Sequence, residues 1–168
     1  MMMMQKGVAE ELTRDQMIGL FNRAEKEGMV LQPSNNQHPG FICCCCGCCC
    51  GVLTAAKKFP DPAEVILTNF YAEIDSENCT ACGDCMDLCQ MDALVSQNTH
   101  IEVLRKRCIG CGVCVKVCST EAITLKKKEK ETIPPKNSMN MYRKMIMERY
   151  GVLGILKFMG KAALGKKI

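Results

Sequence analysis

The chain has 168 residues, a length that suits one compact domain with extensions or two small domains. Its hydrophobic share of 48% counts 15 cysteines, whereas aromatic residues make up only 5% and tryptophan is absent. Packing of large apolar side chains is therefore excluded as the only source of stability, and covalent or metal cross-links are expected instead.

Cysteine usage predicts a reducing compartment. The odd number of cysteines argues against a complete disulfide framework. The first residues lack the charged and then apolar regions of a secretory signal. Thiolate–metal bonds fit this pattern better than disulfides do, so we expect a cytoplasmic protein.

The formal net charge of +4 is unevenly distributed. Residues 1–69 carry a net charge of −1 and residues 70–125 a net charge of −4, whereas residues 126–168, with 12 basic and 3 acidic side chains, carry +9. Such asymmetry predicts that the C-terminal segment contacts a partner or a charged surface.

The N-terminal part is predicted to hold one helix, from Leu12 to Gly28. Thr13 and Gln16 have the spacing of a capping box, and apolar residues recur at helical spacing after them. Residues 29–32 are a short strand candidate. The turn-forming residues at 33–40 predict a loop.

A run of cysteines comes next. Seven cysteines occupy eight positions between Cys43 and Cys50, and only Gly47 interrupts them. Residues 52–59 then predict a short helix that is closed by two prolines. Apolar and polar residues alternate after that helix, which predicts three strands, at residues 70–75, 100–104 and 123–127.

The C-terminal segment is predicted to form a linker and a helix. Residues 126–137 are rich in charge and contain two prolines, as is typical of a linker. Residues 138–168 predict an amphipathic helix, which we expect Gly151 and Gly154 to break.

Between these parts the chain repeats itself. Residues 77–94 and 106–123 align without a gap, and each copy follows the pattern C-x2-C-x2-C-x3-C. A cubane iron–sulfur cluster needs one thiolate on each of its four irons, and this spacing lets a tight loop supply three of them. Glycines in the loops tolerate the positive φ that such bending requires; they are Gly83, Gly110 and Gly112.

Zinc is a poorer match for these eight cysteines. Zinc ribbons usually present two C-x2-C pairs that lie well apart in sequence, whereas each quartet here is continuous and contains no histidine. Two iron–sulfur clusters are therefore predicted. Clusters that serve folding alone are an alternative, although two clusters in one small domain are more typical of electron transfer.

The motifs CTACGDCMDLCQ and CIGCGVCVKVCS make residues 70–125 resemble a bacterial-type two-cluster 2[4Fe-4S] ferredoxin domain. The resemblance implies a small α+β fold with two strand pairs, two short helices and pseudo-two-fold symmetry. It also implies low-potential one-electron transfer and redox partner proteins. The chain departs from the family at Gln90 and Ser119, which replace the proline that usually follows the fourth cysteine.

The resemblance further implies a crossed set of ligands, in which the fourth cysteine of each repeat binds the cluster of the other repeat. The implied ligands of the first cluster are Cys79, Cys82, Cys85 and Cys118. Those of the second cluster are Cys108, Cys111, Cys114 and Cys89. No catalytic residue is predicted.

The run from Cys43 to Cys50 admits several interpretations. A disulfide block is unfavourable, because neighbouring cysteines pair only with strain. A third iron–sulfur cluster or another thiolate metal site is favoured, with Cys43, Cys46 and Cys49 as candidate ligands because of their three-residue steps. Redox-active thiols, a soft-metal store and palmitoylation stay open as alternatives.

The basic C-terminal helix has three candidate roles. It can pack its apolar face on the ferredoxin-like core, dock an acidic redox partner, or lie on an anionic membrane surface. Nucleic acid is not expected as a partner, because aromatic residues are few and no reader motif is present.

The sequence thus predicts an α+β protein of three parts. Residues 1–69 form a helix and a Cys-rich metal or thiol segment, residues 70–125 a 2[4Fe-4S] ferredoxin domain, and residues 126–168 a basic linker and amphipathic helix. We expect a low-potential electron carrier of the cytoplasm of an anaerobe, peripheral to the inner membrane if its tail binds lipid. The alternatives are an iron–sulfur subunit, or fragment, of a larger oxidoreductase complex, and a thiol-redox or metal-storage protein. Catalysis by this chain alone is not expected.

Overall fold

The computed structural model describes residues 2–163 of the chain. They fall into two compact units, one formed by the chain up to Gln32 together with Cys43–Thr132, and the other by Pro33–Ile42 together with the chain from Ile133 onward. Helices and strands are both present, which confirms the predicted α+β class. Within the described range, no helix meets the length and apolarity that a bilayer-spanning segment requires.

Four short strands form two pairs in the repeat region. β3 (Phe70–Ile74) pairs antiparallel with β6 (Ile123–Lys127), and β4 (Leu94–Ser96) pairs antiparallel with β5 (Ile101–Val103). The sequence predicted three of these strands. It missed β4, because Leu94 and Val95 are consecutive apolar residues and show no alternation.

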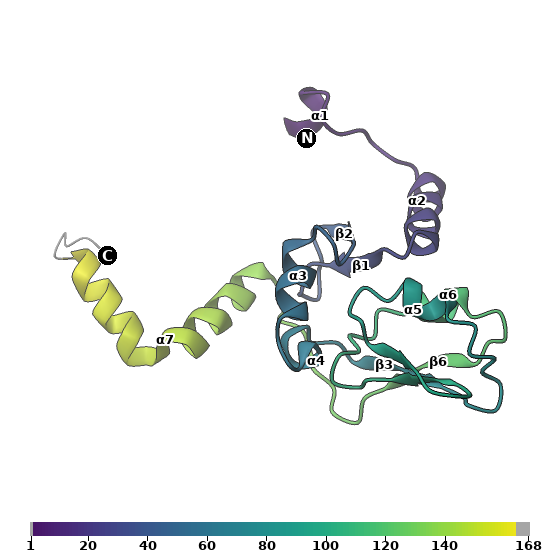
Figure 1. The fold of residues 1–168 in the computed structure, drawn as a ribbon. Coiled ribbons are helices and arrows are strands. Elements are labelled where there is room, and N and C mark those ends of the chain that lie inside the picture. The colour runs from purple at the N-terminus through teal and green to yellow at the C-terminus, as the bar shows by residue number, and fades with distance from the viewer. Residues whose placement is uncertain (1, 164–168) are drawn as a thin grey trace. The chain divides into compact units, whose positions relative to one another are not determined.

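Two short helices complete the repeat region. α5 (Asp84–Asp87) and α6 (Val113–Val117) lie side by side, on the opposite side of this region from the strands (Figure 1). The order strand–helix–strand therefore occurs twice, and the first strand of one half pairs with the last strand of the other. The strand pairs and short helices that the resemblance implies are present.

The N-terminal helix α2 (Arg14–Lys26) is shorter than the predicted range and follows a short helix, α1 (Met2–Gln5). The hydroxyl of Thr13 accepts a hydrogen bond from the Gln16 amide, and the Gln16 side chain accepts one from the Thr13 amide, which confirms the capping box. Of the predicted apolar face, Ala24 is buried, whereas Met17 is exposed.

The cysteine run lies between a strand and a helix. β1 (Val30–Pro33) and β2 (Ile42–Cys45) form a two-stranded sheet, α3 (Gly51–Lys57) follows the run, and α4 (Pro62–Val65) follows α3. The predicted strand and helix on either side of the run are confirmed to within about two residues. β2 was not predicted, because consecutive cysteines show no alternation of apolar and polar residues.

The core of the first unit is shared between the cysteine-run segment and the repeat region. Val30, Leu53 and Ala56 are buried in one cluster of side chains with Met91 and Ile109. The segment from residue 43 to residue 69 therefore packs as part of the same body as the repeat region.

The second unit joins the loop after β1 to the chain that follows Thr132. The amide of Gln37 donates a hydrogen bond to the Pro135 carbonyl at 2.9 Å. The side-chain amide of Asn36, which is buried, donates to the Ser138 hydroxyl at 3.3 Å. These contacts hold the loop against the start of the C-terminal helix.

The C-terminal helix α7 (Ser138–Ala163) is kinked at Gly151, where φ is 61° and ψ is 177° (Figure 1). The predicted break at Gly151 is confirmed, whereas Gly154 remains within the helix. Apolar side chains before the kink, such as Met139 and Tyr142, are exposed. The last part of the predicted helix, residues 164–168, lies outside the described residues.

Candidate metal centres

Two pockets in the first unit collect the eight cysteines of the repeat. One pocket is lined by Cys89, which follows α5, and by three thiols of the second repeat, Cys108, Cys111 and Cys114. Apolar side chains such as Ile109 and Val113 form much of the remaining wall. We call this the Cys89 pocket.

The other pocket has the converse composition. It is lined by Cys118, which follows α6, and by three thiols of the first repeat, Cys79, Cys82 and Cys85. We call this the Cys118 pocket. The two pockets therefore contain the same two sets of four cysteines that the sequence predicts as ligand sets. That these sets bind clusters is still a prediction.

Backbone amides point at sulfur in the Cys89 pocket. The amide of Ala93 donates to Cys89 Sγ at 3.3 Å, and the amide of Ala72 donates to Cys108 Sγ at 3.4 Å. Hydrogen bonds of this kind stabilise the thiolate form of a cysteine and tune the potential of a cluster that it binds. The pocket is therefore built to hold negatively charged sulfur.

The spacing of the eight thiols differs from that of a site for a single ion. Within residues 2–163, only one group of three metal-ligating side chains has its ligand atoms within 4.8 Å of one another, and it contains none of these eight cysteines. No three thiols of either pocket therefore lie within 4.8 Å of one another. Ligands on four separate irons need such wider spacing.

Comparisons with known families agree with this geometry. Residues 72–125 match a family model described as a 4Fe-4S dicluster domain, and residues 107–149 match a second model with the same description. The chain contains a ferredoxin-like 4Fe-4S domain. No curated protein matches the chain. The two matches support iron–sulfur cluster binding and electron transfer by this domain.

Burial affects the ionisation of two thiols in the ferredoxin-like domain. Burial raises the pKa of Cys85 to about 11, and the nearby Cys82 adds to the rise. Burial also raises the pKa of Cys114 to about 12, to which Cys111 contributes. Without a cation these thiols stay protonated at pH 7, so cluster binding must release their protons. They are suited to be ligands, not reactive nucleophiles.

The loops that carry the cysteines depend on glycines, as the sequence predicts. Gly83, Gly110 and Gly112 have φ values of 91°, 63° and 81°. At Gly110, a Cβ atom would lie 2.2 Å from the carbonyl oxygen of Phe70, whereas at Gly83 it would meet nothing within 4 Å. Gly110 is therefore needed both for its backbone conformation and for the close approach of β3.

We expect Gly110→Ala to impair cluster assembly in the Cys89 pocket much more than Gly83→Ala impairs the Cys118 pocket. Both changes place alanine at positive φ, at a cost of about 1–2 kcal/mol. Only Gly110→Ala also forces the loop and β3 apart. Iron content after anaerobic reconstitution and the denaturant midpoint measure the difference. Equal effects of the two changes would show that the contact with Phe70 is unimportant.

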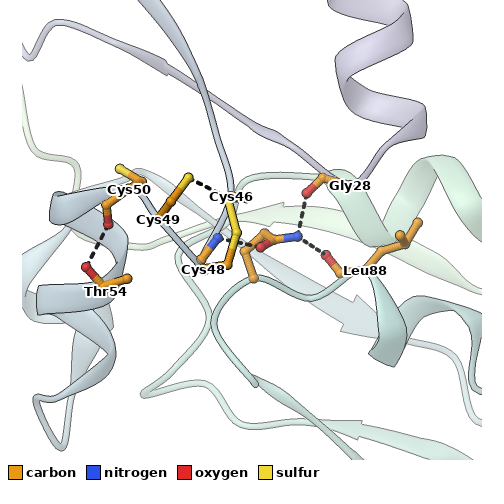
Figure 2. The surroundings of a disulfide bond; sticks show 9 residues. Gly28, Cys46, Cys48, Cys49, Cys50, Thr54 and Leu88 are labelled. Atoms are coloured by element: carbon orange, nitrogen blue, oxygen red, sulfur yellow. Dashed lines mark hydrogen bonds between the residues drawn. A yellow bond between two sulfur atoms is a disulfide. The ribbon is translucent and has the colours of Figure 1, made fainter.

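The structure groups the cysteine run differently from the sequence prediction. Cys46 Sγ lies 3.1 Å from Cys49 Sγ, so two of the three predicted ligands do meet. Cys48 joins them, because the turn after Cys46 brings its sulfur back to this pair (Figure 2). Cys43 is exposed and is not a member of this group.

Cys46 and Cys48 are joined by a disulfide bond in this structure (Figure 2). The sequence makes a disulfide block across the run unfavourable, and the structure shows this one pair, for which the intervening Gly47 leaves room. Cys45 and Cys50, on either side of this turn, are not part of the disulfide. Cys45 is buried and interacts with Cys50, and burial raises the pKa of Cys45 to about 12.

Gln90, which the sequence marks as a departure from the family, has a structural role that the sequence did not predict. Its side-chain nitrogen donates to the Gly28 carbonyl at 2.8 Å, and its side-chain oxygen accepts from the Gly47 amide. Gln90 also lines the Cys89 pocket. The signal was the replacement of the family's proline at this position, since proline has no side chain that could make these bonds.

Proposed function

We propose that the chain is a low-potential one-electron carrier that holds two [4Fe-4S] clusters in a bacterial-type ferredoxin-like domain. The ligands of one cluster are Cys79, Cys82, Cys85 and Cys118, and those of the other are Cys108, Cys111, Cys114 and Cys89. The observation that supports this proposal is the grouping of eight thiols into two pockets, each with three thiols from one repeat and one from the other.

Each cluster, when bound, supplies reversible one-electron redox chemistry. The chain positions the thiols, excludes water with apolar walls and donates amide hydrogens to sulfur. Cys85 lies in α5 and Cys114 in α6, and these two helices pack side by side, which supports a close approach of the two pockets. An electron can therefore pass between them within the domain.

A low potential is consistent with the charge of the ferredoxin-like domain. Residues 70–125 carry a net charge of −4. Each added electron makes a cluster more negative, and surrounding negative charge opposes that addition. We therefore place the potential of both clusters in the low range of ferredoxins.

Iron and sulfide analysis tests the number of clusters. Anaerobically purified protein should contain about 8 iron and about 8 acid-labile sulfide per chain, as expected for two cubanes. After dithionite reduction, its electron paramagnetic resonance spectrum should show two interacting one-electron centres. About 4 iron per chain would contradict the two-cluster proposal. Folded, colourless protein without sulfide would contradict iron–sulfur binding altogether.

A second candidate function is that of an iron–sulfur subunit in a larger oxidoreductase complex. It is supported by the net charge of +9 in residues 126–168 and by the exposed apolar side chains of α7, including Met145 and Tyr150. A basic helix of this kind suits an acidic protein surface or an anionic membrane. Size-exclusion chromatography of native extract distinguishes the functions, since a free carrier elutes near 18.6 kDa.

A further inference from the structure

The thiol trio Cys46, Cys48 and Cys49 is a compact cluster of soft ligands outside the ferredoxin-like domain. Its three sulfur atoms all lie within 4.8 Å of one another (Figure 2). Cys48 and Cys49 are exposed, and Cys46 is half-buried. The trio is therefore open to an ion from solvent.

The trio is more compact than the thiol sets of the two pockets, in part because a disulfide joins Cys46 and Cys48 in this structure. Zinc binds thiolates at about 2.3 Å, so tetrahedral geometry separates two sulfurs by roughly 3.8 Å. A cubane spreads its thiolates over separate irons, and in neither pocket of the ferredoxin-like domain do three thiols lie within 4.8 Å of one another. Thiolates favour soft ions, which points to zinc or copper(I).

The turn that carries the trio is held in place by neighbouring residues. The Gly47 amide donates to the Gln90 side chain. A Cβ atom at residue 47 would lie 2.5 Å from the Gln90 carbonyl oxygen, so the turn packs directly on that backbone. On the C-terminal side, Leu53 of α3 is completely buried. The three thiols are thus presented by an ordered turn, which lowers the entropic cost of binding an ion.

A positive charge lies beside the turn. The ammonium nitrogen of Lys57 would be 3.1 Å from a Cβ atom at Gly47, which is the residue between Cys46 and Cys48. Its side chain is 27% exposed and pairs with Asp92 at 3.2 Å. Three thiolates around a divalent or monovalent cation leave a negative complex, and the Lys57 charge offsets part of it.

We propose that Cys46, Cys48 and Cys49 bind one soft metal ion, zinc or copper(I), through three thiolates. The disulfide between Cys46 and Cys48 is the metal-free oxidised form of the same site. A dithiol reductant supplies two electrons and two protons to cleave the sulfur–sulfur bond and becomes a disulfide itself. Metal binding then displaces the thiol protons. The site is separate from the two clusters and does not depend on them.

Metal titration of the full chain tests this site. Protein reconstituted with iron and sulfide is reduced with dithiothreitol, desalted anaerobically, and titrated with zinc or, in a second arm, with copper(I). Cobalt(II) serves as a spectroscopic probe, because thiolate ligation gives intense charge-transfer bands. We expect one equivalent to bind in addition to about 8 iron. Whichever of zinc and copper(I) binds with the higher affinity is identified as the ion of this site.

Matched variants distinguish the trio from the rest of the run. Cys49→Ala should weaken binding by more than about tenfold and remove the cobalt–thiolate bands, because one of three ligands is lost. Cys44→Ala, an exposed cysteine outside the trio, should bind as the unmodified chain does. Iron content should be unchanged in both variants, which also shows that they fold.

Three results would overturn the proposal. One is about 12 iron per chain with loss of about 4 in Cys49→Ala, which would mean a third cubane. Another is equal weakening by Cys44→Ala and Cys49→Ala, which would mean unspecific chelation by the run. The last is no bound zinc or copper(I) in protein whose thiols are fully reduced. Protein without iron would instead contradict the two-cluster proposal. It would not contradict this one, because the metal titration alone tests ion binding by the trio.

Discussion

Replacing Cys89 with alanine is expected to empty the cluster site of the second repeat, although Cys89 itself belongs to the first repeat. Cys89 lies in the pocket with Cys108, Cys111 and Cys114, and no other cysteine lines that pocket. A cubane without its fourth thiolate is open to solvent at one iron and is readily lost. Iron content should fall from about 8 to about 4 per chain.

Double variants identify which repeat has lost its cluster. Adding Cys108→Ala to Cys89→Ala should remove no further iron, because both residues serve one pocket. Adding Cys79→Ala to Cys89→Ala should remove nearly all the iron, because Cys79 serves the other pocket. Cys44→Ala is the control for loss of an exposed cysteine. The opposite pattern, with additive loss for the Cys108 pair, would show that the ligands do not cross.

Local patterns in the sequence were sufficient to predict the parts of the ferredoxin-like domain. The spacing of cysteines and glycines within each repeat determines the loop, and alternation predicted β3, β5 and β6. The two strand pairs came from the resemblance instead, because a repeat alone does not specify which strands pair. The grouping of Cys89 with the second repeat likewise depends on the packing of α5 beside α6, which no local pattern contains.

The cysteine run shows where sequence reasoning was insufficient. Three-residue steps selected Cys43, Cys46 and Cys49, on the assumption that the run forms a loop around a cube. The structure instead places Cys43 in β2 and makes a tight turn after Cys46, so that Cys48 replaces Cys43 in the group. That turn depends on the contact between Gly47 and Gln90, 43 residues away in sequence. A contact between such distant residues cannot be deduced from one sequence.

Removing both clusters is expected to unfold the ferredoxin-like domain rather than leave it as a stable apoprotein. Its buried side chains include several of small size, Ala72, Ala93 and Ala122, and two that line the cluster pockets, Cys85 and Cys108. The larger buried apolar side chains form a core that is small for folding by packing alone; they are Met91, Leu94, Ile101, Ile109, Val113 and Ile123. Each crossed cluster also closes a loop of about 20 to 40 residues, worth roughly 3–4 kcal/mol if it acts as a disulfide does.

Thermal unfolding and hydrogen exchange measure this dependence. Treatment with a chelator and an oxidant, followed by anaerobic desalting, should abolish the cooperative transition and expose the amides of β3 and β6 to exchange. Reconstitution with iron and sulfide should restore both signals, which excludes irreversible damage.

Two variants test the pockets one at a time. Cys108→Ala removes a ligand of the Cys89 pocket, and Cys79→Ala removes a ligand of the Cys118 pocket. Each change should lower the transition temperature without abolishing the transition. Because β3 pairs with β6, loss of either cluster loosens a strand that both halves share. An apoprotein that keeps a cooperative transition and protected β3–β6 amides would show that packing alone maintains the fold, and that the clusters serve electron transfer only.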